Sequence, residues 1–364
     1  MAKHVGAIDQ HTTGTRCMIF DHDGHEVARH QMSHEQITPR AGWLEHDPHE
    51  IWEATQDVVE AVLGRAGTSA DDLAAIGLSA QRETTVVWDR RTGVPYYNAI
   101  ARRDERTGTL GSGARIRWIL DHVDSARADA EAGHAVFGTI DTWLIWWLTG
   151  GPDDGLHVTD VTSAARTSLM DLETLTWDAD RIDRIGIPAS MLPVVGSSSQ
   201  VYGRTAADGP FGGEVALAGA LAGEHAALVG QVCFRTGEGR RADDVLMLNT
   251  GGQMQTSDGS VTTVAYRLGD APPVYALEGP VEMVAAGDPE LRAVRVDGAP
   301  AADDTAMQGL ADTLGVPVSR PVVAETAALG AAFAAGLGVG FWADTDELVA
   351  RRHESRRWEP TATG

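Results

Sequence analysis

The segment from Ala7 to Asp21, AIDQHTTGTRCMIFD, places the strongest constraint on how this chain can fold. Two apolar runs flank a short polar turn, which is the pattern of a β-hairpin. The predicted strands are Val5–Asp9 and Arg16–Asp21, and a third strand over Glu26–Met32 follows an Asp23-Gly24 turn. The chain therefore opens with a three-stranded meander.

The tip of the first hairpin carries groups that suit a phosphate. Asp9 ends the first strand, Thr12 and Thr13 crowd the turn, and Arg16 follows. Backbone N–H groups, hydroxyls and a cation can bind phosphate oxygens, while the carboxylate can hold a hydrated Mg²⁺. The alternative is an ordinary hairpin with a polar tip, and short motifs of this kind often match by chance.

Length and charge limit the partners of this chain. Its 364 residues suffice for two domains, and its 52 acidic and 29 basic residues give a net charge of −23. Such an acidic chain is not expected to bind nucleic acid or an anionic membrane surface.

A scarcity of lysine and cysteine excludes several classes of protein. Lys3 is the only lysine, so a Walker A loop, a protein-kinase strand lysine and a pyridoxal Schiff base are all excluded unless Lys3 serves. The two cysteines, Cys17 and Cys233, lie in apolar surroundings. No disulfide framework is expected, and a cytoplasmic location is predicted.

Alternating strands and helices are predicted along the rest of the chain. A first helix begins after Asp47, with Pro48 at its first position, Glu50 completing a capping box and Gly64 ending it. A change to small residues over Val215–Gly223 suggests the start of a second domain. The other predicted strands are 73–80, 84–88, 245–248, 291–297 and 316–322. Three further helices are predicted: one after residue 137, one that ends at residue 314 and one over 325–335.

Several blocks of sequence, taken together, carry a resemblance. They include AIDQHTTGTR, EQITPRAGWLEHDPHEIW, IGLSAQRETTVVWD, PYYNAI, RWILDHV, FGTIDTWLIW, HVTDVTSAARTSLMD and ALGAAFAAGLGVGFW. In this order they resemble the FGGY family of carbohydrate kinases over nearly the whole chain. Gln81-Arg82-Glu83-Thr84 favours the glycerol kinases over their pentulose-kinase relatives.

The resemblance implies a fold and a reaction. The fold is α/β, with two actin-like (RNase H-like) ATPase domains of which the second is shortened. The expected divisions are an N-terminal domain over 1–214, a C-terminal domain over 215–345 and a loose tail over 346–364. The implied reaction transfers the γ-phosphoryl group of ATP, with Mg²⁺, to a terminal hydroxyl of glycerol and yields sn-glycerol 3-phosphate and ADP.

The resemblance also implies roles for individual residues. Asp9 would act in catalysis and anchor Mg²⁺, and Glu224 would be the catalytic base. Arg82, Glu83, Glu224 and His225 would bind the polyol. The nucleotide would be bound by Thr12, Thr13, Gly14, Arg16, Gly298, Ala299 and Asp303.

The chain departs from the family pattern at several of these positions. His11 replaces a glycine of the phosphate loop, and Glu224-His225 replaces an Asp-Gln pair. The second phosphate turn has become the acidic Ala242-Asp243-Asp244-Val245, and the turn from Asp297 to Asp304 has also gained acidic residues. Two internal segments are expected to be missing, one between Ile100 and Arg115 and one between Ala286 and Leu291.

Three hypotheses about function follow. The first is a glycerol kinase that uses Mg²⁺ and ATP. The second is a noncatalytic member of the family that binds a polyol or a partner protein. The third is a kinase for another small polyol or sugar. The oligomeric state is left open, with a homo-oligomer among the alternatives.

Overall fold

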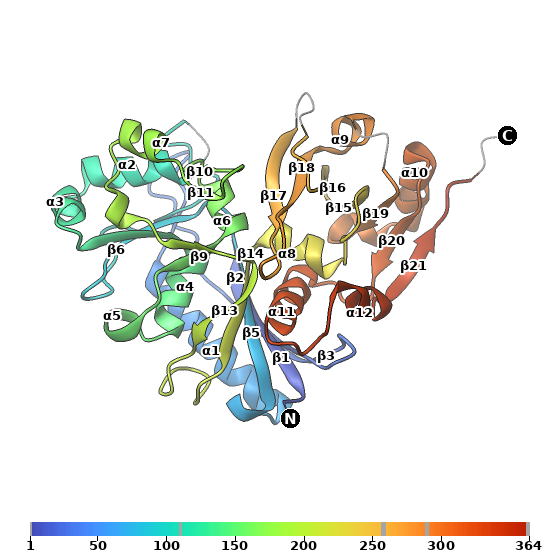
Figure 1. The fold of residues 1–364 in the computed structure, drawn as a ribbon, viewed down its shortest axis with the longest axis horizontal. Coiled ribbons are helices and arrows are strands. Elements are labelled where there is room, and N and C mark those ends of the chain that lie inside the picture. The colour runs from blue at the N-terminus through green and yellow to red at the C-terminus, as the bar shows by residue number, and fades with distance from the viewer. Residues whose placement is uncertain (1, 109–110, 256–259, 288–290, 362–364) are drawn as a thin grey trace.

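Two lobes lie side by side in the computed structural model, which describes residues 2–108, 111–255, 260–287 and 291–361 (Figure 1). The first lobe is built around a six-stranded sheet and the second around a seven-stranded sheet. The cooler colours of Figure 1 mark the first lobe and the warmer colours the second, with the helices α8 and α11 at their junction.

The first sheet has the strand order β13-β14-β5-β1-β2-β3. Its strands β1, β2 and β3 form the predicted antiparallel meander, and β5 and β14 add parallel strands to it. The predicted early strands are thereby confirmed. The bounds are β1 His4–His11, β2 Gly14–Phe20, β3 Glu26–Ser33, β5 Leu73–Ala80, β13 Ser199–Arg204 and β14 Ala216–Ala222.

The second sheet repeats this topology. Its order is β17-β18-β16-β15-β19-β20-β21, in which β18, β16 and β15 form an antiparallel meander and β19 and β20 add parallel strands. The repeated order confirms the predicted pair of actin-like α/β units. The bounds are β15 Glu238–Ala242, β16 Val245–Gly251, β17 Val261–Tyr266, β18 Val274–Pro280, β19 Ala293–Val296, β20 Val318–Pro321 and β21 Glu354–Trp358.

The change of sheet comes later than the predicted boundary at residue 215. Strand β14 pairs with β5 in the first sheet, and the second sheet begins only at Glu238. The small residues of β14 reflect close packing instead of a new domain: a Cβ on Gly219 would lie 2.6 Å from the backbone nitrogen of Ala335 on α11. The composition change that suggested a boundary is therefore a helix-packing signal.

The predicted loose tail over 346–364 is folded through most of its length. Helix α12 covers Thr345–Ala350, and β21 pairs antiparallel with β20 at the edge of the second sheet. Trp358 is buried on this strand, so apolar contact holds the segment in place. Residues 362–364 lie outside the described part of the chain.

Helix α1 runs over Pro48–Ala66 and is capped by Asp47, whose side chain accepts a hydrogen bond from the backbone N–H of His49. Two details of the prediction were wrong. The Glu50 carboxylate accepts from the backbone N–H of Glu35 instead of closing a capping box. The helix also continues past Gly64 to Ala66, and Gly67 caps its end with a φ of 61°, which suits glycine.

Further elements complete the first lobe beside the main sheet. They include a four-stranded sheet, β4-β7-β6-β8, and the two-stranded sheets β10-β11 and β12-β9. The bounds are β4 Glu45–His46, β6 Thr85–Asp89, β7 Ala99–Ile100, β8 Ala135–Thr139, β9 Val158–Asp160, β10 Met170–Asp171, β11 Thr176–Trp177, β12 Val194–Gly196, α2 Ser112–His122, α3 Ala126–Glu131, α4 Ile140–Leu148, α5 Gly151–Asp154, α6 Val161–Arg166 and α7 Ala179–Ile185.

Helices α8 (Gly223–Gly230) and α11 (Thr326–Gly338) join the lobes. Helix α11 follows β20 of the second sheet, yet packs on β1, β5 and β14 of the first. The second lobe also contains α9 Val281–Gly287 and α10 Asp304–Leu314. Residues 288–290, within the second segment expected to be shortened, lie outside the described part of the chain.

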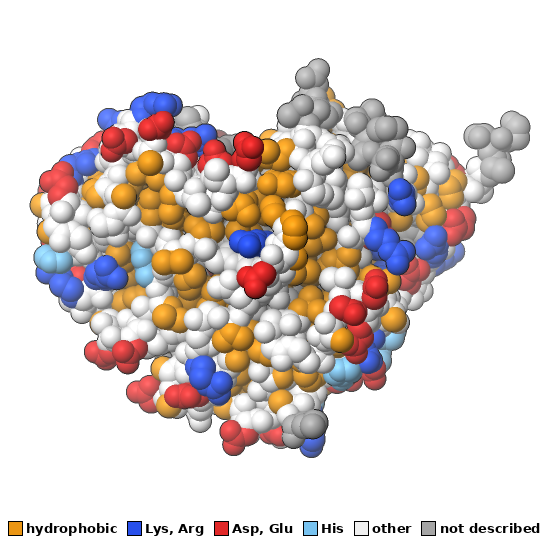
Figure 2. All heavy atoms as spheres, in the orientation of Figure 1, with side chains coloured by type: hydrophobic (Ala, Val, Ile, Leu, Met, Phe, Trp, Pro, Cys, Tyr) orange, Lys and Arg blue, Asp and Glu red, His pale blue; other side chains and the backbone are white. Residues whose placement is uncertain are grey.

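The core is apolar and rich in tryptophan. Trp88 and Trp143 are fully buried, as are the free thiols of Cys17 and Cys233. Among the described residues, no helix is both long and apolar enough to cross a membrane. On the face drawn in Figure 2, acidic and basic side chains are interspersed, without one extended basic patch.

Candidate active site

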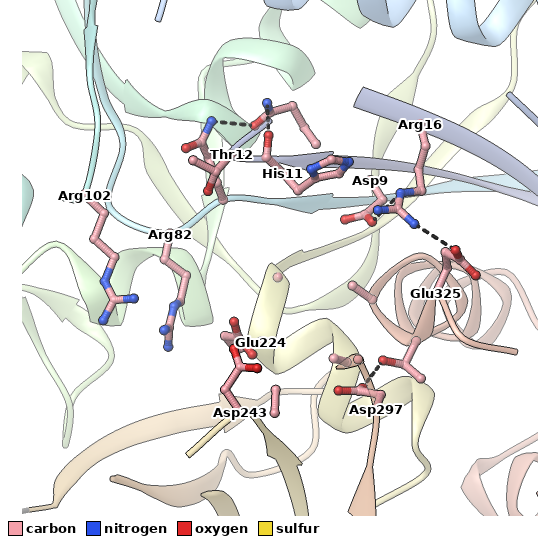
Figure 3. A pocket seen from close by; sticks show the side chains of 18 of the residues that line it. Asp9, His11, Thr12, Arg16, Arg82, Arg102, Glu224, Asp243, Asp297 and Glu325 are labelled. Atoms are coloured by element: carbon pink, nitrogen blue, oxygen red, sulfur yellow. Dashed lines mark hydrogen bonds and ion pairs between the residues drawn. The ribbon is translucent and has the colours of Figure 1, made fainter. Parts of the chain in front are cut away.

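A cavity of about 490 Å³ lies between the lobes, at the ends of their central strands. It is lined by the tip of the β1–β2 hairpin, the loop after β5, the first turn of α8, the tip of the β15–β16 hairpin and the start of α11 (Figure 3). Because the two sheets share one topology, their first hairpin tips face the same space. Of the predicted residues, Asp9, Thr12, Arg16, Arg82, Glu224, Gly298 and Ala299 line this cavity.

Asp9 and Arg16 form one wall. The Arg16 Nε atom lies 3.3 Å from Asp9 Oδ2, and its Nη1 atom lies 3.2 Å from Glu325 Oε1. Burial raises the pKa of Asp9, although Arg16 and a hydrogen bond from Ser79 act in the opposite direction. Burial disfavours the charged form of the carboxylate, and one arginine offsets this cost only in part. A bound cation would therefore stabilise the ionised Asp9 further.

His11 stands where the family has glycine. It is the last residue of β1 and pairs with Gly14, so extended backbone suffices and no positive φ is required. Its ring lines the cavity, and its Nδ1 atom lies 3.2 Å from the Thr13 hydroxyl. Burial lowers the pKa of His11 to about 4, which leaves the ring neutral near pH 7.

Two predicted nucleotide-binding residues of this hairpin do not line the cavity. Thr13 is exposed and is not among the residues that line the cavity. Gly14 has a structural role, because a Cβ there would lie 2.3 Å from the carbonyl oxygen of Met32 on β3. The close approach of β3 therefore explains this glycine.

Glu224, the candidate base, sits in the first turn of α8 and lines the cavity. Its carboxylate pairs with Arg240 of β15. The same guanidinium binds both oxygens of Asp297, with Nε–Oδ2 and Nη2–Oδ1 distances of 3.0 and 2.7 Å. Arg240 therefore joins the candidate base to the acidic end of β19.

Arg82 and Glu83, the predicted polyol pair, point into different surroundings. Arg82 lines the cavity, and its Nη1 atom lies 2.6 Å from Glu278 Oε1 on β18. Glu83 is buried outside the lining, with a positive φ of 62°. Its two oxygens lie 2.9 Å from Arg166 Nε and 2.7 Å from Arg102 Nε.

Arg166 completes a network that spans the two lobes. Its Nη1 atom lies 3.1 Å from Glu278 Oε2, so Arg102, Glu83, Arg166, Glu278 and Arg82 form one chain of ion pairs. The two arginines lower the pKa of Glu278 to about 2, against the effect of burial. Each carboxylate in the chain thus lies between two arginines.

His225 and Asp303 lie away from the cavity lining. His225 is fully buried behind Glu224, with Nε2 3.4 Å from the Thr263 hydroxyl, and burial lowers its pKa to about 3. Asp303 caps α10 by accepting from the backbone N–H groups of Thr305 and Ala306. In contrast, Gly298 and Ala299 lie at the cavity, and the φ of 72° at Gly298 suits glycine.

The acidic second turn is less unfavourable to phosphate than its sequence suggests. Asp243 lines the cavity, whereas Asp244 is fully exposed and lies 3.9 Å from Arg241. Only one of the two carboxylates therefore faces the site.

Mg²⁺ fits the residues present through Asp9. No group of three or more His, Cys, Asp or Glu side chains within the described ranges is arranged to hold a metal. Mg²⁺ does not need such a cage, because it is commonly held by one or two carboxylates together with waters and substrate phosphates. The buried, cavity-facing carboxylate of Asp9 meets that requirement.

Sequence reasoning missed Arg102, Arg166, Arg240, Glu278 and Glu325. One signal was available for Glu278: it interrupts the apolar strand VYALEGP, and a charge on a buried strand needs partners. The pairing of Arg240 with Glu224 had no local signal.

Two overlapping segments of the chain, residues 4–112 and 108–230, match the N-terminal domain of the FGGY family of carbohydrate kinases. These segments cover more than half of the chain, and the fold has the two lobes and intervening cavity described above. The chain belongs to the FGGY family of carbohydrate kinases.

Its similar relatives are glycerol kinases. Glycerol kinase 1 of Streptomyces coelicolor is 43% identical over 99% of this chain and 94% of its own length, and the glycerol kinase of Chloroflexus aurantiacus is 42% identical over 99% and 95%. The alignment with the first extends over 477 positions, more than the 364 residues here, so the relative contains segments that this chain lacks.

Solved structures share the fold. Plasmodium falciparum glycerol kinase with ADP matches with a TM-score of 0.88 at 24% identity, covering 98% of this chain and 94% of that one. A xylulose kinase from Lactobacillus acidophilus matches with a TM-score of 0.83 at 16% identity, covering 99% and 94%.

Proposed function

We propose that this protein transfers the γ-phosphoryl group of ATP to a terminal hydroxyl of a small polyol, with glycerol as the acceptor that its relatives indicate. The observation that carries the proposal is the shared cavity. It brings Asp9, Thr12 and Arg16 of one lobe opposite Glu224, and Arg82 extends into the same cavity from one side. Together with the 43% identity to a glycerol kinase, this arrangement supports phosphoryl transfer.

Each side chain has a separate role in the proposed reaction. Glu224 accepts the proton of the attacking hydroxyl and orients its oxygen, and Arg82 donates to the polyol. Arg16, the Thr12 turn and the Gly298-Ala299 turn bind the nucleotide. Asp9 would hold Mg²⁺, which neutralises charge on the phosphates when bound.

Turnover of glycerol with Mg·ATP tests this proposal. Purified protein is expected to form sn-glycerol 3-phosphate and ADP, and Glu224→Gln is expected to lower kcat by about 100- to 10,000-fold because the base is lost. Glu282→Gln on α9, which removes an exposed carboxylate outside the cavity, is the matched control. Product formation by Glu224→Gln at the wild-type rate would remove Glu224 from its assigned role.

A noncatalytic role is the second candidate, and the pairing of Glu224 with Arg240 favours it. In the structure the candidate base is engaged by a cation, so binding without turnover is the competing expectation. Calorimetry separates the candidates: polyol binding without Mg·ATP binding supports the noncatalytic role, and micromolar Mg·ATP binding contradicts it.

A further inference from the structure

A buried polar cluster lies in the block HVTDVTSAARTSLMD and has no part in the reaction described above. Asp160 ends β9 and caps α6, and Thr162 lies in the first turn of that helix. Both side chains are fully buried, as is that of Ser198, which precedes β13. None of the three lines the cavity between the lobes. A buried charge without substrate contact requires partners and a reason for its position.

The Asp160 carboxylate accepts four hydrogen bonds. Its Oδ1 atom accepts from the Ser163 N–H and from the Thr162 hydroxyl, both at 2.9 Å. Its Oδ2 atom accepts from the Thr162 N–H at 3.0 Å and from the Ser198 hydroxyl at 2.8 Å. Four donors match the lone-pair sites of an ionised carboxylate. Burial and the nearby Asp141 raise the pKa of Asp160 to about 6, which still leaves the group mainly ionised at pH 7.

These bonds fix the direction of the Thr162 hydroxyl. Because the hydroxyl donates its proton to Asp160, its lone pairs are left to accept, and they accept from the backbone N–H of Ala222 at 2.8 Å. The N–H of Ala220, two residues earlier, binds the carbonyl oxygen of Ser198. The pairing of β13 with β14 extends to Gly219, so Thr162 supplies the partner where strand pairing ends.

Ala222 lies where strand β14 becomes helix α8. It is the last residue of the strand and the N-cap of the helix, and it has no side chain that could cap the helix itself. Glu224 follows two residues later, so a shift at Ala222 would move the candidate base directly. Arg240 contacts the carboxylate of Glu224 from the second lobe, whereas Thr162 holds the backbone from which that side chain extends.

We propose that Asp160 and Thr162 are positioning residues that fix the backbone from which Glu224 reaches the attacking hydroxyl. Asp160 orients the Thr162 hydroxyl, the hydroxyl holds the Ala222 N–H, and the first turn of α8 is thereby set against the cavity. The inference rests on the proposed phosphoryl transfer and adds the support of its base. Neither side chain contacts a substrate, so both act only through the start of α8.

Steady-state kinetics with glycerol and Mg·ATP test this inference. Thr162→Val removes the hydroxyl while keeping a similar shape, and it is expected to lower kcat by about 10- to 100-fold because a small displacement of the base is costly. The KM for Mg·ATP is expected to change by less than about threefold, since the β1–β2 hairpin is not disturbed. Thr162→Ser keeps the hydroxyl and should retain kcat within about threefold.

Thr55→Val is the matched control. It removes another fully buried threonine hydroxyl, one that donates to the carbonyl oxygen of Ile51 within α1, and is expected to leave kcat unchanged. A wild-type kcat in Thr162→Val overturns the inference, as does an equal loss in Thr162→Ser or in Thr55→Val. Thr162→Ala, which removes the hydroxyl with less bulk, replaces Thr162→Val if that variant does not fold.

Amide hydrogen exchange separates this inference from the proposed function. Wild-type protein that forms no product contradicts the proposed function, and exchange at Ala222 then decides the inference. Exchange at Ala222 that is at least about 10-fold faster in Thr162→Val than in the wild type, with the rate at Ala220 unchanged, supports the inference. An unchanged rate at Ala222, or an equal increase at both amides, contradicts it.

Discussion

Single residues at this site are held by charges that come from distant parts of the chain. Arg240 of β15 joins Glu224 of α8 to Asp297 after β19. Breaking a buried pair is costly because it leaves a charge without compensation. The position of the candidate base therefore depends on an arginine in the other lobe.

Replacement of Arg240 tests that dependence. Arg240→Gln leaves the buried Asp297 without its cation and is expected to lower the free energy of unfolding by about 3 kcal/mol. Arg241→Gln replaces the neighbouring, more exposed arginine and is expected to change the free energy of unfolding by less than about 0.5 kcal/mol. Urea unfolding at pH 7 measures both. Equal effects of the two variants would contradict the buried role of Arg240.

The contribution of the ion-pair chain to the stability of the protein depends on pH through Glu278. Arg82 and Arg166 hold the pKa of Glu278 at about 2, below the ordinary value of 4.5. A carboxyl whose pKa is depressed by folding stabilises the protein above its unfolded pKa, and this contribution is lost as the pH falls from about 4.5 to about 2.

Glu278→Gln is therefore expected to lower the free energy of unfolding by about 3 kcal/mol at neutral pH, since it leaves two arginines without a shared carboxylate. The difference from the wild type should shrink as the pH falls below about 4.5. Urea unfolding at pH 7 and in the acid range measures this convergence. A constant difference at every pH would show that Glu278 acts through packing alone.

At the scale of elements, the position of α8 depends on its contact with α11. The two helices cross where glycines allow their backbones to meet. A Cβ on Gly330 would lie 1.8 Å from the carbonyl oxygen of Ala226, and one on Gly230 would lie 2.0 Å from that of Thr326. Since Glu224 sits one turn from this crossing, helix packing sets the place of the candidate base.

Gly330→Ala is expected to force the helices apart, lowering the free energy of unfolding by about 3 kcal/mol. Displacement of Glu224 by about 1 Å would lower kcat by about 100-fold. Gly309→Ala on α10 is the control, because a Cβ there meets nothing within 4 Å. It is expected to stabilise the protein by up to about 1 kcal/mol and to leave kcat unchanged. Calorimetric unfolding and steady-state rates provide the readouts.

At the scale of the whole molecule, the net charge of −23 opposes compaction. Like charges repel across the surface, and salt screens them over distances of about 10 Å at 0.1 M and about 3 Å at 1 M. The thermal midpoint is therefore expected to rise by a few degrees, on the order of 2–4 °C, between low salt and about 0.5 M NaCl. A fall in the midpoint would mean that attractive ion pairs outweigh the general repulsion.

Much of the fold follows from local sequence, since apolar alternation and turns mark the early strands and the cap at Asp47 marks the first helix. The site is less predictable. Asp9, Arg16, Arg82 and Glu224 were expected to act together and do share the cavity. Glu83 was also expected there, but its positive φ and two arginine partners keep it out of the lining.

Local sequence predicted the opening three-stranded meander and the start of the first helix, because strand alternation, turn chemistry and helix starts depend on neighbouring residues. The pair of actin-like α/β units and the candidate base Glu224 were implied by the resemblance to the family. Only the tertiary structure decided which charges meet. Arg240 with Glu224, and Glu278 with Arg82 and Arg166, are brought together by the meeting of two lobes. Pairing across such distances depends on how whole sheets and helices pack, and no short stretch of sequence contains that information.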